Sequence, residues 1–505
     1  MYVVFLGIGG LIVEIHLKQK DWLFLLVCFG LGILAELSFF HGRIGLAYPL
    51  FITGFYLVIF LRYRLSFNHR RIGLLIMVAV WILAGSFLFN DTQFFYGLNI
   101  LIIPALVFYH LVLITSPRNL KWERLGFIRL LTMKLLEGVQ YSTAFCKVLF
   151  RRIFKNMNET TIQLIKRIVI GLAIGIPLLF VVIVLLMSAD AVFEELILYL
   201  PNFVFQLSFQ EWIFRFILVI LITLLFFGIF QVLHIRSKLR PTNDFLLQED
   251  KKKIRWDAVT AITVLIMLNV VYVLFAAIQL PYFFSDNLLG GFTYASYARR
   301  GFFELLFVTL INWTILISCL KLVKTKARRT RLTLKVLYTL LIAVSGIMLA
   351  SAYQRLSMYE SAYGFTLDRI LAHAFMIYLL VIFAYTFIRV WLEGLTLLHF
   401  YTITALVFYA VLNMMNVEQV IVNNNLERFE QTGKIDVYYL DSLSYTGLGG
   451  LIALYETDPV YPELRTILQY RKEEVNNEPE STWQSFNFTR QEVTEKILKL
   501  DLEIN

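Results

Sequence analysis

Long apolar runs, separated by charged breaks, recur along most of this 505-residue chain. A helix needs about 20 apolar residues to cross a hydrocarbon core of about 30 Å, and many of these runs approach that length. The composition agrees, because 59% of the residues are hydrophobic and only 16% are charged, against roughly 25% charged in soluble domains. The sequence therefore predicts a polytopic transmembrane helix bundle of the all-α class.

The apolar runs between charged breaks predict about twelve spans. The first run, from Met1 to Val13, has no basic segment before it and no small-residue cleavage site. It is short for a span, but this pattern favours a retained helix rather than a signal peptide. The predicted spans cover residues 1–16, 22–40, 44–61, 72–90, 95–115, 168–188, 212–235, 257–280, 302–320, 336–354, 370–388 and 398–417.

Basic residues are divided unequally between the two sets of connectors that alternate along the chain. One set carries 32 lysines and arginines, and the other carries five, which are Arg43, Arg299, Arg300, Arg355 and Arg369. Cytoplasmic loops retain positive charge during insertion, so the first set is predicted to be cytoplasmic and both termini to lie outside a bacterial plasma membrane. The net charge of +10 then reflects loops beside anionic lipid rather than nucleic-acid binding.

The chain divides into four predicted parts. Residues 1–115 form N-terminal transmembrane helices, 116–167 a basic cytoplasmic connector, 168–417 the core transmembrane bundle and 418–505 an acidic extracytoplasmic tail. The connector has 11 basic residues and helical apolar spacing, which favours helices lying on the inner leaflet; a connector with no role beyond anchoring is the alternative. The tail, with 8 basic and 16 acidic residues, is predicted to be a small helical domain resting on the helix mouths.

No motif of a soluble enzyme occurs in the sequence, which lacks GxGxxG after a strand, a P-loop, HExxH and GxSxG. The three cysteines show neither a disulfide framework nor the CxxC spacing of a metal site. The seven histidines are scattered singly, and a lone histidine on an apolar helix is more often a hydrogen-bonded packing residue than a ligand. No catalytic residue, cofactor or metal is predicted.

Ionisable residues gather near the outer ends of three predicted spans. Charge at membrane depth is costly and usually faces a bundle interior or a wet cavity. Four of the five outward-loop arginines lie there, although insertion disfavours them. We expect these charges to converge with neighbouring tyrosines in one outward-facing cluster, made of Asp190, Tyr297, Arg299, Arg300, Glu304, Arg355, Tyr359, Tyr363, Asp368 and Arg369.

Two interpretations of this cluster stay open. In the first, the arginines pair with carboxylates such as Asp190, Glu304 and Asp368 and fasten helix ends together. In the second, the arginines line a pocket in which their planar groups bind phosphate or carboxylate.

Several phrases of the sequence, taken together, resemble a known family. They are Ser188-Ala189-Asp190, the run from Tyr297 to Phe302, the segment from Arg355 to Arg369 and the tail phrase from Asn425 to Leu440. As a set they are similar to bacterial multi-pass proteins grouped as domain of unknown function 4173, and to the related 4153 group, over about residues 168–454. The resemblance implies many membrane helices and an extracytoplasmic C-terminal segment, but no catalytic residue.

These features favour a plasma-membrane protein of the binding or transport type, with an outward-facing polar site for an anionic envelope component or lipid-like ligand. The alternative is a non-enzymatic signalling or assembly partner whose tail and basic loops dock another membrane protein. A lipid-modifying transferase with Asp190 or Glu304 as base has less support, because no nucleophile or metal set accompanies them. The expected partners are the bilayer, anionic lipid at the basic loops and a membrane protein, without nucleic acid.

Overall fold

Ten of the twelve predicted spans are helices in the computed structural model. The span expected over residues 168–188 lies, apart from isolated positions, outside the described residues. The polytopic helix bundle is therefore confirmed, and of the other two expected spans one is corrected below and one stays a prediction. Apart from isolated positions, the structure describes residues 2–6, 12–16, 19–63, 68–117, 122–123, 125–153, 209–238, 256–283, 302–478 and 482–502.

The first expected span is wrong, because a β-hairpin takes its place. Strand β1 (Tyr2–Leu6) pairs antiparallel with β2 (Ile12–His16), so that Val4 lies opposite Glu14. Both strands are rich in β-branched residues, which favour extended backbone, and the run between them contains three glycines, which disfavour a helix. Sixteen residues are also too few to span a bilayer as a helix.

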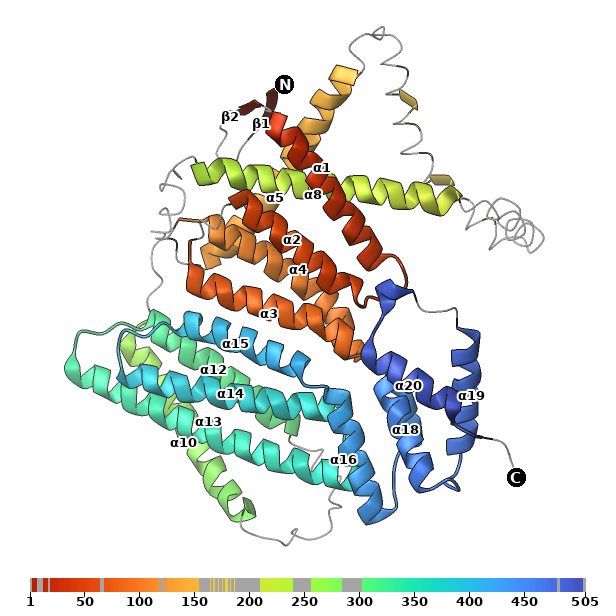
Figure 1. Cartoon of the computed structure of the whole chain (residues 1–505). Helices are drawn as coiled ribbons and strands as arrows, with labels where there is room; N and C mark the ends of the chain where they lie inside the picture. The colour runs from red at the N-terminus through yellow and green to blue at the C-terminus, as the bar shows by residue number, and fades with distance from the viewer. Residues whose placement is uncertain are drawn as a thin grey trace.

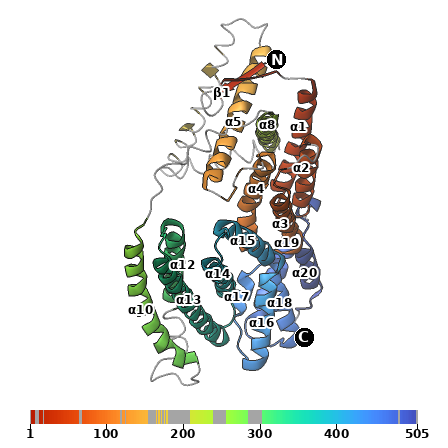
Figure 2. The same cartoon turned by 90° about the vertical axis from the view of Figure 1, so that its left-hand side faces the viewer.

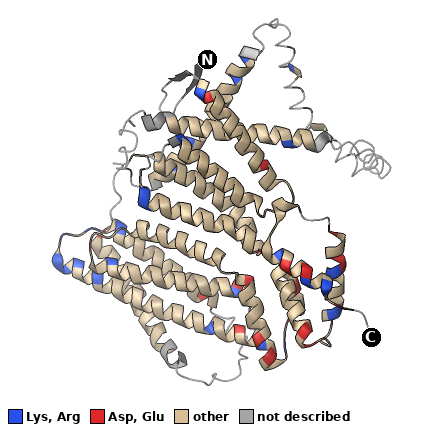
Figure 3. Cartoon of the chain, viewed as in Figure 1, with Lys and Arg blue, Asp and Glu red and all other residues tan. Residues whose placement is uncertain are grey.

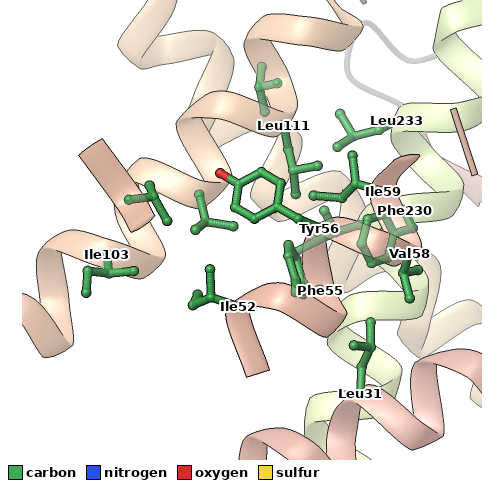
Figure 4. Close-up of a cluster of buried hydrophobic side chains, with 14 of the residues drawn as sticks. Leu31, Ile52, Phe55, Tyr56, Val58, Ile59, Ile103, Leu111, Phe230 and Leu233 are labelled. Carbon is green, nitrogen blue, oxygen red and sulfur yellow. The ribbon is translucent and has the colours of Figure 1, made fainter. Parts of the chain in front are cut away.

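Six helices pack around the first hydrophobic core (Figure 1). In Figure 4, Leu31, Tyr56, Leu111 and Phe230 converge from four of these helices. The hydroxyl of Tyr56 lies 3.0 Å from Nδ1 of the buried His110, so this histidine has the packing role that its isolated position predicts. This first bundle consists of α1 (Gln19–Phe39), α2 (Ala47–Tyr63), α3 (Arg70–Phe89), α4 (Gln93–Thr115), α5 (Leu125–Ile153) and α8 (Phe209–Lys238).

A second bundle has a separate core, and one further helix lies between the two bundles (Figure 2). That helix, α15 (Leu397–Met414), packs against α3 of the first bundle and α14 of the second. Helix α13 has 36 residues, so at 1.5 Å per residue it is about 54 Å long and extends beyond a bilayer core. The second bundle consists of α10 (Ala258–Phe283), α12 (Phe302–Leu322), α13 (Arg328–Tyr363) and α14 (Leu367–Trp391).

The predicted tail is a helical domain with a third core, which includes Phe95 of α4. It docks on the first bundle: the Leu46 N–H donates to the Phe486 carbonyl at 3.1 Å, and the Asn487 amide donates to the carbonyls of Phe87 and Asn90 at 2.9 and 3.1 Å. Its elements are α16 (Val417–Thr432), α17 (Val437–Ser442), α18 (Tyr445–Thr457), α19 (Leu464–Asn477), η1 (Trp483–Ser485) and α20 (Phe488–Lys499).

Charged residues are segregated between the two ends of the bundles (Figure 3). Apart from α5, which crosses the first bundle, successive bundle helices run in alternating directions. The short basic connectors therefore gather at one end, and the tail with its acidic residues lies at the other. The basic connectors and the tail thus lie at opposite ends, as the unequal division of basic residues predicts. Which end lies outside the cell stays a prediction.

Helix α5 occupies most of the predicted basic connector. One face, with Phe127, Tyr141 and Phe145, is buried in the first core, while Ile128 and Leu136 on the other face are 57% and 58% exposed. An exposed apolar face is what an inner-leaflet helix would present to lipid. Its position on that leaflet stays a prediction.

Candidate functional site

The predicted charge cluster is only partly within the described chain. Asp190, Tyr297, Arg299 and Arg300 lie outside the described residues. Glu304 lies in the first turn of α12 and is exposed. Convergence of the full set therefore stays a prediction.

The turn between α13 and α14 brings three members of the cluster together. The rings of Tyr359 and Tyr363 stack with centroids 4.9 Å apart, and the Arg369 guanidinium lies 4.4 Å from the Tyr359 ring centre. Arg369 also donates to the Gly364 carbonyl. Arg355 is half-buried one turn before Tyr359 on α13, and the first turn of α14 contains the exposed Asp368.

Tail residues hold this turn in place. Gly364 has a φ of 86°, which disfavours a side chain, and the space for one is taken by the Asn425 amide oxygen. That amide bonds both the N–H and the carbonyl of Phe365, at 2.9 and 2.8 Å, while Arg428 donates to the carbonyls of Ser361 and Ala362 at 3.0 and 2.7 Å. These contacts favour a structural role for the described part of the predicted cluster.

A buried acid–base pair beneath the turn was not among the predicted site residues. His373 Nε2 lies 2.8 Å from Glu360 Oε2, and the two side chains are 12% and 6% exposed. The sequence placed His373 on an apolar helix as a hydrogen-bonded packing residue, and this contact fits that expectation. Glu360 accepts this contact from α13, so the pair joins α13 to α14.

A polar cavity of about 270 Å³ lies elsewhere, where the tail meets the loop ends of the first bundle. We call it the junction cavity. Its wall on the bundle side comes from the α1–α2 loop and the α3–α4 turn, and its opposite wall comes from the α17–α18 turn and α19. The lining residues are Arg43, Asp91, Gln93, Tyr96, Asp441, Ser442, Leu443, Ser444, Tyr445, Leu448, Arg471, Glu474, Val475 and Glu478.

Most charged groups on the tail side of the cavity are already paired. Arg471 donates to Asp441 at 2.8 Å and to Glu474 at 2.7 Å. Glu478 accepts from Arg490 at 2.6 Å and from the Tyr445 hydroxyl at 3.1 Å. These pairs fix the shape of the acidic wall.

Asp91 supplies the buried charge on the bundle side. Its side chain is 10% exposed, and its Oδ2 lies 3.6 Å from Nη1 of Arg43, which is 55% exposed. Burial raises the pKa of Asp91, while the positive charges of Arg43 and Arg490 oppose that rise. A hydrogen bond from the Tyr445 backbone N–H opposes the rise as well, but burial has the larger effect.

Glu418 lies behind the cavity wall, 2% exposed, and accepts hydrogen bonds from the hydroxyl and the N–H of Ser444. Burial is the main reason that the pKa of Glu418 is raised, and the negative charge of Asp91 adds to it. The folded chain thus holds this proton more tightly than the unfolded chain. Its contribution to stability is complete below the ordinary pKa of 4.5 and is lost as the pH rises through the raised value.

We therefore expect Glu418→Gln to stabilise the protein at pH 8 and to make little difference near pH 4. Thermal unfolding in mild detergent across this pH range measures the effect. Glu427→Gln, at an exposed position on the same helix, is the control and should behave as wild type. A Glu418→Gln variant that is less stable than wild type at pH 8 would contradict the assigned direction.

A seam of buried amides begins beside the junction cavity. Tyr96 lines both the cavity and a neighbouring hollow of about 10 Å³, which has about the volume needed for one water. In the wall of the hollow, Asn99 donates to Asn413 at 2.6 Å and accepts from the Tyr409 hydroxyl at 2.7 Å. Asn90 donates to the Asn413 carbonyl at 2.6 Å. The seam joins α3 and α4 to α15.

The described part of the chain thus forms a helical membrane protein in which a tail domain closes a polar cavity against the loop ends of one bundle. Its family follows from comparison with known sequences: the chain belongs to the family described as Domain of unknown function (DUF4153), whose model matches residues 77–454. No curated protein and no solved structure matches the chain. The match begins in α3 and ends in α18, so it includes Asp91 and Tyr445 but not Arg43 or α19.

Proposed function

We propose that this protein is a binding protein of a bacterial plasma membrane and that the junction cavity is its ligand site. The cavity itself is the observation that best supports the proposal. It is concave, near the lower end of the size range of small-molecule sites, and lined by charged groups of both signs. The ligand is an envelope component or lipid headgroup with an anionic group, which Arg43 binds. We also propose that the chain is related to the 4173 group of multi-pass proteins.

The cavity is proposed to open outside the cell, because the opposite helix ends carry the basic connectors. A Val460→Cys variant tests this orientation, since Val460 is 87% exposed on the tail. In a Cys146→Ser background, a membrane-impermeant maleimide should label it in intact cells. Labelling that requires cell lysis would place the tail in the cytoplasm.

Native mass spectrometry after gentle extraction tests the binding function. We expect the wild-type protein to carry a small adduct, and Ser442→Trp to lose it by filling the cavity from its exposed rim. Val460→Trp, on the same domain but outside the cavity lining, should retain the adduct. An adduct that survives in Ser442→Trp, or a wild-type protein with none, would overturn the proposal.

An assembly role is the second candidate, supported by exposed apolar side chains on the tail. Tyr438, Val460 and Tyr470 are 61%, 87% and 67% exposed, and they lie on the domain farthest from the basic connectors. Exposed aromatic residues are enriched at protein interfaces. The same mass spectra distinguish the two roles, because an assembly partner would appear as a co-purified protein.

A further inference from the structure

We infer that the ligand of the junction cavity carries a primary ammonium group that donates a hydrogen bond to Asp91, beside an anionic group that Arg43 binds. The ligand class is a small zwitterion of the phosphoethanolamine type, either free or as the headgroup of a lipid. This inference rests on the proposed function and adds the chemistry of its ligand.

One oxygen of the Asp91 carboxylate has no hydrogen-bond donor within the described chain, although the carboxylate also accepts from the Tyr445 backbone N–H. Its Oδ2 is buried, belongs to a residue that lines the cavity, and accepts no hydrogen bond from any described residue. The guanidinium of Arg43 is 3.6 Å away, beyond the usual length of a charge-assisted hydrogen bond. A buried acceptor that receives no hydrogen bond lowers the stability of the folded protein. A ligand with an N–H donor at this oxygen would remove that cost on binding.

Carboxylates outnumber arginines in the wall of the cavity. The lining contains four carboxylates and two arginines. Three of those carboxylates already accept short hydrogen bonds, because Asp441 and Glu474 share Arg471, and Glu478 is bound by Arg490. The wall therefore favours a cationic group on the ligand over a further anionic one. Asp91, on the bundle side, is the carboxylate that can accept a hydrogen bond from it.

Arg43 and the cavity volume define the anionic half of the ligand and the size of the whole ligand. The Arg43 side chain is 55% exposed, so its planar N–H groups remain accessible to phosphate or carboxylate. The cavity volume of about 270 Å³ is close to the lower limit of about 300 Å³ for small-molecule sites. A compound as small as phosphoethanolamine fits that volume.

Binding of three probes to the full chain in mild detergent tests the inference. Phosphoethanolamine has N–H donors and phosphate, phosphocholine has a cation without N–H donors, and glycerol 3-phosphate has phosphate without a cation. We expect phosphoethanolamine to bind at least about tenfold more tightly than the other two. In nanodiscs, retention of phosphatidylethanolamine over phosphatidylcholine by the wild-type protein would instead identify a lipid headgroup as the source.

Two variants assign the roles. Asp91→Asn should bind all three probes about equally, or in nanodiscs lose the lipid preference, whereas Glu492→Gln, exposed on α20 away from the cavity, should behave as wild type. Arg43→Gln, at an exposed side chain, should weaken all probes about tenfold without changing their ratio. This second variant keeps the test decisive if Asp91→Asn does not fold.

Equal affinity of the wild-type protein for the three probes would overturn the inference. So would an unchanged preference in Asp91→Asn, or no binding in detergent together with no lipid preference in nanodiscs. An adduct that is lost from Ser442→Trp would still support the binding function in each of these cases, so the two failures are distinguishable.

Discussion

Replacing Gly228 by alanine should lower the free energy of unfolding by about 3 kcal/mol, because α5 and α8 approach each other at this glycine. An added methyl group would meet the Ser142 hydroxyl and the Gly138 carbonyl of α5. It would also disturb the hydrogen bond from that hydroxyl to the Leu224 carbonyl, which joins the two helices at 2.6 Å. Titration from mild detergent into SDS measures the loss.

Gly85→Ala is the matched control, since Gly85 is also in a helix of the first bundle but has open space where a side chain would lie. Alanine there should be neutral or stabilise by about 0.5–1 kcal/mol, because it lowers the entropy of the unfolded chain. Equal behaviour of the two variants would mean that α5 and α8 do not pack this closely.

The second large effect is expected at Gly45, where the tail backbone rests on the α1–α2 loop. A methyl group would lie 2.5 Å from the Phe486 carbonyl oxygen and 2.6 Å from the Ser485 carbonyl carbon. Both neighbours are backbone, so the tail must move, and the Leu46 to Phe486 hydrogen bond is lost. We expect Gly45→Ala to weaken docking of the tail by about 2 kcal/mol.

Limited proteolysis of the tail in the full-length protein measures this change, and cleavage should be about thirtyfold faster if it proceeds through the undocked state. Gly30→Ala, with open space around its added carbon, is the control and should leave the rate unchanged. Gly45→Ala with a wild-type cleavage rate would contradict the docked arrangement.

The membrane spans could be predicted because each is set by local chemistry. A run of apolar residues between charged breaks needs no knowledge of its neighbours, and α3, α4 and α14 begin and end within about three residues of the predicted spans. Hydrophobicity alone does not predict the pairing of β1 with β2, because that pairing depends on β-branched residues and on the glycines between the strands.

The junction cavity could not be predicted from local pattern, because its walls are far apart in the sequence. Arg43 was recognised as an outward-loop arginine but left out of the cluster, and Asp91 is an isolated acid in a short turn. Only packing of the tail places Glu478 near them. A signal was present in Asn99 and Asn413, since an amide inside an apolar span usually marks a helix contact.

The amide seam between the first bundle and α15 restricts how the molecule can move. Rocking transporters swing one bundle against another about a fixed point. Here, parting α15 from the first bundle on the tail side would break the buried hydrogen bonds of Asn99 to Asn413 and Tyr409. In a rocking motion of this kind, the tail side would therefore be the hinge. The helices would separate at the end that carries the basic connectors. The ring contact between Trp122 and His399, with centroids 4.7 Å apart, would be among the first contacts to break.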